Sequence, residues 1–340
     1  MSNAETLQPY NCIETDSTEM NSIEKKPLVI LTGPTAVGKT ALSIKLAKAI
    51  NGEMISADSM QVYKYMDIGT AKIMPDEMDG ITHHLIDVLD PKEDFNVFTF
   101  QTMAKKALDE IYAKGKVPII VGGTGFYIQS LLYDISFEDT EVSTYRAELT
   151  SDYEKYGAHA LHERLKDIDP ISYEDIHENN VKRVIRALEF YHDTGYPISQ
   201  HNAKQREKES PYNFEYFVLN DDRSLLYERI EKRIDIMVKQ GLVDEVRKLL
   251  DYGCKPEMVS MQGLGYKEIV PYLNGECSLE DAIYVLKRDT RHFAKRQLTW
   301  FRREKVVTWV DKSEFENEDK MLAFMLQQLE KRRIITCKTN

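Results

Sequence analysis

The chain has few cysteines and no long apolar run. Its four cysteines, spread over 340 residues, are far apart and form no C-x-x-C pair, so neither a zinc site nor a disulfide framework is indicated. No apolar run approaches the length of a bilayer span, and the N-terminus lacks the apolar core of a signal peptide. We therefore expect a cytoplasmic protein with no membrane partner.

The chain also lacks an overall basic charge. Its net charge of −11 argues against indiscriminate binding of nucleic acid, whose phosphates would be repelled on average. One local exception lies between Lys287 and Lys305, where eight Lys or Arg residues face only two acidic ones. A charge run of this kind is more often a solvated helix face than a binding surface, and both interpretations stay open from composition alone.

The most specific motif present is a phosphate-binding loop. Its eight residues match the pattern G-x-x-x-x-G-K-[ST] in full, with an apolar strand-like run at 28–32 before it and a helical apolar repeat after it. Strand, glycine loop and helix in this order direct backbone N–H groups at an anion. We expect Lys39 to reach the outer phosphates and Thr40 to hold Mg²⁺. The loop is Gly33-Pro34-Thr35-Ala36-Val37-Gly38-Lys39-Thr40.

Strand and helix patterns alternate along most of the chain, which predicts an α/β fold with a parallel sheet flanked by helices on both faces. Further strands are expected at 53–57, 117–121, 216–219 and 306–310, and helices at about 98–114, 223–252 and 279–303. The predicted organisation is a disordered tail or expression remnant at 1–26, a core at 27–136 and 206–312, a helical insertion domain at 137–205, and a C-terminal helix and tail at 313–340.

Ligands of such sheets bind at the carboxyl ends of the strands, which brings Asp58 and the glycines at 122–125 beside the loop. The third strand ends in glycines, so the acid that an ATP hydrolase needs there is missing. Asp58 could ligate Mg²⁺, accept a proton from a nucleophile or cap a turn with Ser59. Thr124 could donate a hydrogen bond or belong to a simple turn. The pair His83-His84 lacks further metal ligands, so packing is favoured.

The motifs together resemble those of the tRNA dimethylallyltransferase family, over about Lys26 to Val310. Each short motif is weak alone, but the combination is highly specific. The residues that carry the resemblance are 33–40, 56–63, 69–72, 83–87, 122–127, 186–189, Arg233, Met237, 241–242, 245–246, 265–268, 290–291, 294–297 and 299–302.

Such enzymes transfer a dimethylallyl group from its diphosphate to the exocyclic amine of an adenine beside the tRNA anticodon. The resemblance implies a P-loop NTPase-like fold, Mg²⁺ as cofactor, and a helical insertion that grips the anticodon stem-loop. It also implies that the loop holds pyrophosphate as a leaving group, so no water need be activated against ATP. The implied partners are dimethylallyl diphosphate and the tRNA anticodon stem-loop, and we expect a monomer.

Individual roles carry over by position. The implied catalytic residues are Asp58 as proton acceptor, Thr124 near the reacting amine, and Arg233 and Lys39 at the diphosphate. The diphosphate would lie against Gly33 to Thr40, and the metal against Thr40 and Asp58. The implied tRNA contacts are Asp58, Ser59, Met60, Gln61, Thr124, Arg146, Lys182, Arg183, Arg186, Gln262, Gly263, Lys267, Lys295 and Arg296.

Two departures from the family pattern lie in supporting segments. The chain has His177-Glu178-Asn179-Asn180 where the family usually has His-Pro-Asn-Asp, and Ile81-Thr82 where Val-Pro is common. They put detail of the insertion in doubt, not the reaction. Three alternatives stay open: an adenylate isopentenyltransferase acting on a free nucleotide, a small-molecule kinase, and a non-enzymatic nucleotide-dependent RNA-binding module.

Overall fold

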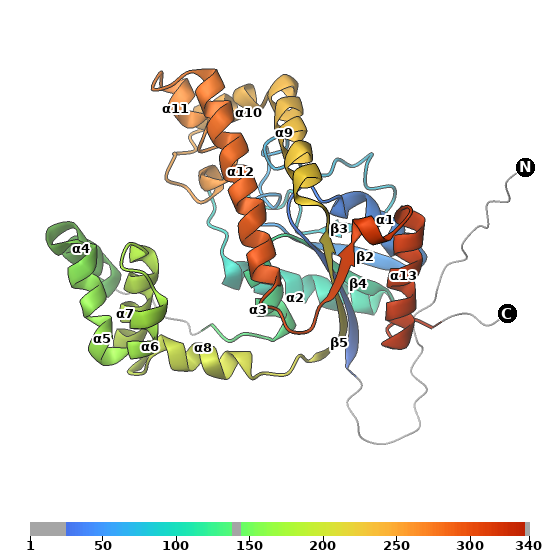
Figure 1. Cartoon of the computed structure of the whole chain (residues 1–340), viewed down its shortest axis with the longest axis horizontal. Helices are drawn as coiled ribbons and strands as arrows, with labels where there is room; N and C mark the ends of the chain where they lie inside the picture. Colours follow the sequence, from blue (N-terminus) through green and yellow to red (C-terminus); the bar gives the residue numbers. More distant parts are fainter. Residues whose placement is uncertain (1–24, 138–143, 337–340) are drawn as a thin grey trace, which may run out of the picture. The chain divides into compact units, whose positions relative to one another are not determined.

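A computed structural model describes residues 25–137 and 144–336 of the chain (Figure 1). The predicted tail at 1–26 lies almost wholly outside these residues, and the chain enters its first strand at Lys26. The strands are β1 Lys26–Thr32, β2 Gly52–Ala57, β3 His83–His84, β4 Val117–Gly122, β5 Tyr212–Asn220 and β6 Thr308–Asp311.

The helices account for most of the remaining chain. Those before β5 are α1 Lys39–Ala49, α2 Val97–Ala113, α3 Gly125–Leu132, α4 Thr144–Glu163, α5 Leu165–Ile168, α6 Pro170–Asp175, α7 Val181–Thr194 and α8 Ile198–Arg206. Those after it are α9 Arg223–Gln240, α10 Leu242–Asp251, α11 Val270–Leu273, α12 Leu279–Phe301 and α13 Glu318–Lys331, with short 3-10 turns η1 Ser260–Gln262 and η2 Lys312–Glu314.

The sheet has six strands in the order β3-β2-β4-β1-β5-β6, and every pairing is parallel. This confirms the predicted parallel α/β sheet. Its central strand β1 is buried from Leu28 to Thr32, as expected of a strand covered on both faces. The parallel registers align the carboxyl ends of β1, β2, β4 and β5 along one edge of the sheet.

Helices cover both faces because the chain crosses the sheet in both directions. The β1-α1-β2 crossover runs toward β3, whereas β3-α2-β4 runs back toward β1. Since both crossovers are right-handed by rule, α1 and α2 lie on opposite faces. The region 223–252 holds two helices, α9 and α10, which are separated by Gly241. Figure 1 shows α9 beside α12, the longest helix described.

The chain divides into two compact units. One comprises Met1–Leu131 with Pro211–Asn340 and contains the sheet; the other is Leu132–Ser210. The predicted insertion at 137–205 falls inside the second unit, which is helical and has its own apolar core. That core includes Leu149, Leu161, Leu165, Val184, Ile185, Ala187 and Leu188. In the described part of the chain, no helix is both long and apolar enough to cross a bilayer.

Candidate active site

The phosphate-binding loop joins β1 to α1 at the carboxyl edge of the sheet. Gly33 has φ of 147°, and a Cβ there would lie 2.6 Å from the carbonyl oxygen of Leu219, so only glycine fits this approach of the loop to β5. No side chain caps the N-terminus of α1. The first N–H groups of α1 therefore lack side-chain acceptors and can bind an anion, as the sequence predicts.

Two lysine side chains bond to carbonyl oxygens of this loop. Lys39 Nζ donates hydrogen bonds to the carbonyl oxygens of Gly33 at 3.0 Å and Pro34 at 2.9 Å. Lys312, which follows β6, donates to the Val37 carbonyl at 3.4 Å. The second lysine was not predicted as a site residue, because its approach depends on the pairing of β6 with β5.

Lys39, Arg233 and Asp58 are close enough to influence one another. The pKa of Lys39 is lowered to about 8, chiefly by burial and also by the positive charge of Arg233, whereas the negative charge of Asp58 opposes the shift. Solvent reaches part of Arg233, but the dense protein around its guanidinium lowers its pKa. In the described residues, Arg233 has no ion pair or hydrogen bond with a protein group. Two mutually repelling cations beside the uncapped N-terminus of α1 form a site for a polyvalent anion.

This electrostatic arrangement predicts a distinctive pH dependence. In metal-free buffer, the affinity for pyrophosphate should fall as the pH rises above about 8, because Lys39 then loses its charge. Relative to a variant that cannot lose this charge, the fall should approach about tenfold per pH unit. Lys39→Arg is that variant, since arginine stays protonated. Calorimetry measures the pyrophosphate affinity of wild type and Lys39→Arg at each pH, and their ratio cancels the titration of pyrophosphate itself. If the two affinities changed with pH in parallel, the assignment of Lys39 would be contradicted.

Asp58 follows the end of β2, and its two carboxylate oxygens have different surroundings. Its Oδ1 accepts hydrogen bonds from the backbone N–H of Met60 at 2.8 Å and of Gln61 at 3.3 Å, so it caps the turn that starts the next loop. In the part of the chain that the structure describes, no protein donor bonds its Oδ2. The turn-capping role and a chemical role are therefore compatible, one for each oxygen.

A backbone hydrogen bond connects Thr124 to the residue before Asp58. The Thr124 N–H donates to the carbonyl of Ala57 at 3.2 Å, so the turn after β4 is attached to the residue that precedes Asp58. Thr124 is half-buried, and it starts the turn that leads into α3. The structure thus brings Lys39, Asp58, Thr124 and Arg233, the four predicted catalytic residues, to one edge of the sheet.

Gln297 connects the loop to the turn after β4, and the sequence did not predict this role. From α12, its Oε1 accepts the Thr35 N–H at 2.9 Å and its Nε2 donates to the Gly123 carbonyl at 3.0 Å. The Gln297 residue is only 6% exposed. It therefore fixes the spacing of two segments that face the same ligand.

Gln297→Met should lower the free energy of unfolding by about 1 kcal/mol, because it leaves a partly buried donor and a partly buried acceptor without partners. Pyrophosphate affinity should also fall, since the loop loses a support. Urea denaturation and calorimetry measure the two effects. Gln327→Met, at an exposed position of α13, is the matched control and should change neither. Equal stability of the two variants would show that Gln297 is dispensable.

Two segments with predicted tRNA contacts, 58–61 around the target base and the contact strip 262–267, lie against each other. A Cβ at Gly263 would lie 2.8 Å from the Met60 sulfur, so the backbone at 263 packs tightly on this loop. Gln61 Nε2 donates to the carbonyl oxygens of Thr70 and Ala71, both at 3.2 Å. Gln262 and Lys267 are exposed and available to a ligand.

A buried carboxylate holds the loop that follows Asp58. Glu245, from α10, accepts the backbone N–H groups of Asp67, Ile68 and Gly69 at 2.8–2.9 Å. It also accepts the Tyr266 hydroxyl at 2.7 Å. No role was predicted for Glu245 beyond its place in a family motif. Four bonds to one carboxylate hold this irregular segment in a single conformation.

The predicted tRNA contacts in the insertion divide into two kinds. Lys182 and Arg183 are exposed at the start of α7. Arg146 pairs with the buried Glu189 through two hydrogen bonds of 2.8 and 2.6 Å, and Arg186 adds a third at 3.0 Å. The two paired arginines are thus held in place by Glu189, and their contact with RNA stays a prediction.

The remaining predicted positions are two RNA contacts on α12 and the histidine pair. Lys295 and Arg296 are exposed on α12. His84 Nε2 lies 3.0 Å from a carboxylate oxygen of Glu53, and His83 Nδ1 lies 2.9 Å from the carbonyl of Ile81, which agrees with packing roles. Among the described residues, no three His, Cys, Asp or Glu side chains are grouped as a metal site.

The fold and the site together define a P-loop NTPase-like protein, in which Asp58 after β2 supplies the carboxylate beside the loop. A sequence model of the IPP transferase family matches residues 61–304. The chain belongs to this family of tRNA dimethylallyltransferases, which confirms the resemblance found in the sequence.

Relatives cover nearly the whole chain. The tRNA dimethylallyltransferase of Lachnoclostridium phytofermentans is 60% identical over 311 residues, 91% of this chain and 99% of the relative. That of Acetivibrio thermocellus is 51% identical over 296 residues, 87% of this chain and 95% of the relative. The crystal structure of the tRNA isopentenylpyrophosphate transferase of Bacillus halodurans is 46% identical with a TM-score of 0.69, covering 91% of this chain and 98% of that one.

A more distant structure shares the fold. A eukaryotic dimethylallyltransferase, crystallised acting on tRNA, is 28% identical with a TM-score of 0.77 and covers 90% of this chain and 80% of its own. The names of these proteins favour the tRNA enzyme over the adenylate isopentenyltransferase, the kinase and the non-enzymatic module as an interpretation of this chain.

Proposed function

We propose that the protein transfers a dimethylallyl group from dimethylallyl diphosphate to the exocyclic amine of the adenine next to the tRNA anticodon and releases diphosphate. One observation carries this proposal. The cations Lys39 and Arg233 lie at a P-loop beside the carboxylate Asp58, and Arg233 has no protein counter-ion among the described residues. The name of the family supports tRNA as the acceptor and a dimethylallyl group as what is transferred, and we propose the diphosphate as the donor.

The residues support both halves of the transfer. The bond from the allylic carbon to the diphosphate oxygen breaks, and the electron pair leaves with diphosphate. Loop N–H groups, Lys39 and Arg233 stabilise the charge that develops there. The amine nitrogen forms the new bond to carbon, and its proton passes to Asp58 Oδ2. In this proposal the Thr124 hydroxyl orients the amine, and the adenine must leave its stack to enter, as base-modifying enzymes require.

Mg²⁺ fits the donors that the site offers. Thr40 is exposed in the first turn of α1, and Asp58 could ligate the ion through a water molecule, which leaves its Oδ2 to accept the proton. One hydroxyl and one carboxylate suit an ion that keeps several waters and takes phosphate oxygens as further ligands. When bound, Mg²⁺ would neutralise part of the diphosphate charge.

The RNA side of the proposal rests on the exposed cations and the base-facing segments. Lys182, Arg183, Lys295 and Arg296 offer charges to phosphates, 58–61 offers the surroundings of a flipped base, and 262–267 offers a further contact strip. We propose further that the protein acts as a monomer in the cytoplasm, on the anticodon stem-loop.

The decisive experiment supplies Mg²⁺ and labelled dimethylallyl diphosphate with either an anticodon stem-loop or AMP. We expect label in the stem-loop, and none in the same RNA with the target adenine replaced by uridine. Label in AMP but never in RNA would reject the proposal in favour of the adenylate enzyme. Transfer of phosphate from ATP to a small molecule, without prenyl transfer, would support the kinase.

A further inference from the structure

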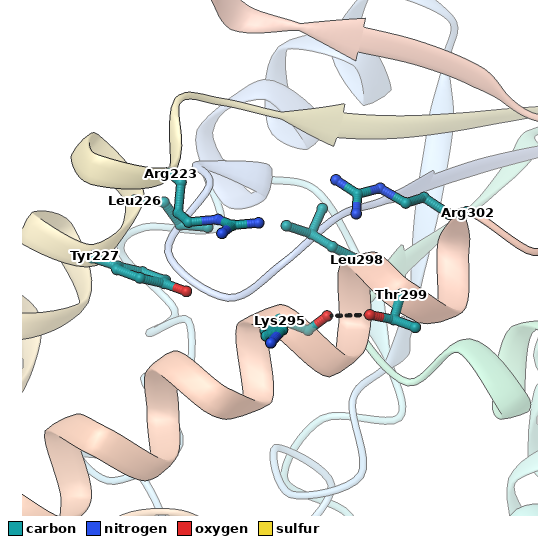
Figure 2. Close-up of a pocket in the computed structure, with 7 residues that line it drawn as sticks. All are labelled: Arg223, Leu226, Tyr227, Lys295, Leu298, Thr299 and Arg302. Atoms are coloured by element: carbon teal, nitrogen blue, oxygen red, sulfur yellow. Dashed lines mark hydrogen bonds between the residues drawn. The ribbon is translucent and has the colours of Figure 1, made fainter.

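A small cavity lies between the start of α9 and the second half of α12, outside every site assigned above except at Lys295 (Figure 2). Its volume is about 40 Å³. The buried side chains of Leu226 and Leu298 form part of its lining. The remaining lining residues are polar or basic: Arg223, Tyr227, Lys295, Thr299 and Arg302. We call this cavity the α9–α12 pocket.

Three positive charges meet at the α9–α12 pocket without a carboxylate. Figure 2 shows the guanidinium groups of Arg223 and Arg302 extended toward each other over Leu298, with the Tyr227 hydroxyl turned toward the same space. In the described part of the chain, none of Arg223, Lys295 and Arg302 has an ion pair.

Most other basic side chains of these two helices have a counter-charge. Five of them pair with a carboxylate: Arg229 with Asp221, Lys232 with Glu228, Lys287 with Asp235, Arg288 with Asp289 and Arg291 with Glu231. In the described residues Arg233, Lys239 and Arg296 also lack an ion pair, so what distinguishes the pocket is that three such cations line one cavity. Cations that converge on a concave surface repel one another, and an anion held between them would remove that repulsion.

The chemistry of the lining selects a phosphate. Two guanidinium groups and an ammonium offer charged donors, and the Tyr227 hydroxyl offers a neutral one, so an oxyanion is favoured over a cation or an apolar group. Thr299 already donates to the Lys295 carbonyl at 2.9 Å. At roughly 10–15 Å³ for each water-sized group, the cavity has room for about three oxygens. That is the size of one phosphate group.

We propose that the α9–α12 pocket binds one backbone phosphate of the RNA substrate, an inference that rests on the proposed function. RNA is favoured over the diphosphate donor because the loop, Lys39 and Arg233 already serve the donor, while Arg223, Lys295 and Arg302 are exposed. The bound phosphate bridges α9, which carries Arg233, to α12, which carries Gln297. RNA binding then braces the two helices that support the diphosphate site.

The test compares Arg223→Gln, Arg302→Gln and the double variant with wild type. Fluorescence anisotropy of a labelled anticodon stem-loop, over a series of KCl concentrations and without prenyl donor, gives affinity and its salt dependence. We expect each single variant to bind RNA about tenfold more weakly, the scale of one charged hydrogen-bonded contact. The salt slope should fall by about 0.7 to 0.9, the value for one phosphate contact.

The double variant and the controls decide between explanations. If both arginines hold the same phosphate, their losses combine to less than the roughly hundredfold product of independent contacts. Arg247→Gln removes an exposed arginine of α10 that pairs with Asp244, and should leave RNA affinity unchanged. Pyrophosphate affinity should stay equal in all variants.

Several results would overturn the inference. Wild-type RNA affinity in both single variants would show that the pocket holds no RNA phosphate. A weaker pyrophosphate affinity with unchanged RNA affinity would assign the pocket to the diphosphate instead. A full multiplicative loss in the double variant would mean two separate contacts. If circular dichroism shows that the double variant is unfolded, the affinities of the two single variants alone test the proposal. The affinities are measured without prenyl donor, so they do not depend on catalysis. Failure of the separate prenyl-transfer assay would reject the proposed function but would leave these affinities interpretable.

Discussion

Asp58→Asn is expected to lower the turnover of prenyl transfer roughly 10²-fold or more, while the affinity for the stem-loop stays near that of wild type. The amide keeps an oxygen that accepts the N–H groups of Met60 and Gln61, so the turn after β2 survives. It cannot accept the proton of the adenine amine, and loss of a proton-transfer group has an effect of this scale. Single-turnover kinetics with saturating RNA measure the loss directly.

Asp58→Ala separates the chemical role of this residue from its structural role. Alanine removes the turn cap as well as the proton acceptor, so it should lose stability in addition to turnover. If Asp58→Asn turned over like wild type and only Asp58→Ala were impaired, the carboxylate would be a cap and no more. Stem-loop affinity is the control measurement, because a general collapse of the loop would weaken RNA binding in both variants.

The sequence predicted the core of the fold well because its strong signals are local. The strands at 28–32, 53–57 and 117–121 are short apolar runs between turns, and each is found within a residue or two of its expected bounds. The strand β3 was not predicted. It has only two residues, His83 and His84, and its extension depends on pairing with β2 rather than on its own pattern.

The candidate site was predictable where chemistry resides in a motif. The loop at 33–40 needs its glycines and lysine in fixed order, and the topology of a parallel sheet brings Asp58 to the same edge. Gln297, Glu245 and Lys312 were not predicted in their roles. Gln297 lies 262 residues from Thr35, and Glu245 lies 178 residues from Asp67. Such contacts follow from tertiary packing, and a glutamine or glutamate gives no local sign of its distant partner.

The charge of a residue is also a poor predictor of binding when its ion-pair partner cannot be recognised in the sequence. The sequence presents Arg146 and Arg186 as cations for RNA, yet both pair with the buried Glu189. Conversely, Arg223 was given no binding role and Arg302 was counted only within the basic run 287–305 and a family motif, although in the described structure both lack such partners. Composition counts charges, whereas binding depends on which charges remain uncompensated after folding.

Arg233→Gln is expected to lower turnover about 10²–10³-fold, the range for loss of one group that stabilises charge on a leaving group. The matched control is Lys232→Gln, which removes one positive charge from the adjacent position of α9, where the lysine pairs with Glu228. The control should keep wild-type turnover. If both variants lost activity equally, the effect would belong to the net charge of α9 and not to a contact with diphosphate.

The same variant offers a second readout that a merely structural arginine would not produce. The charge of Arg233 is one cause of the low pKa of Lys39, so its removal should raise that pKa above about 8. The pH at which pyrophosphate affinity begins to fall should therefore move upward in Arg233→Gln and stay fixed in Lys232→Gln. Lost turnover with an unmoved pH profile would mean that Lys39 and Arg233 do not share one anion. Lost turnover together with the shift would place both cations on the same leaving group, as charge stabilisation during carbon–oxygen cleavage requires.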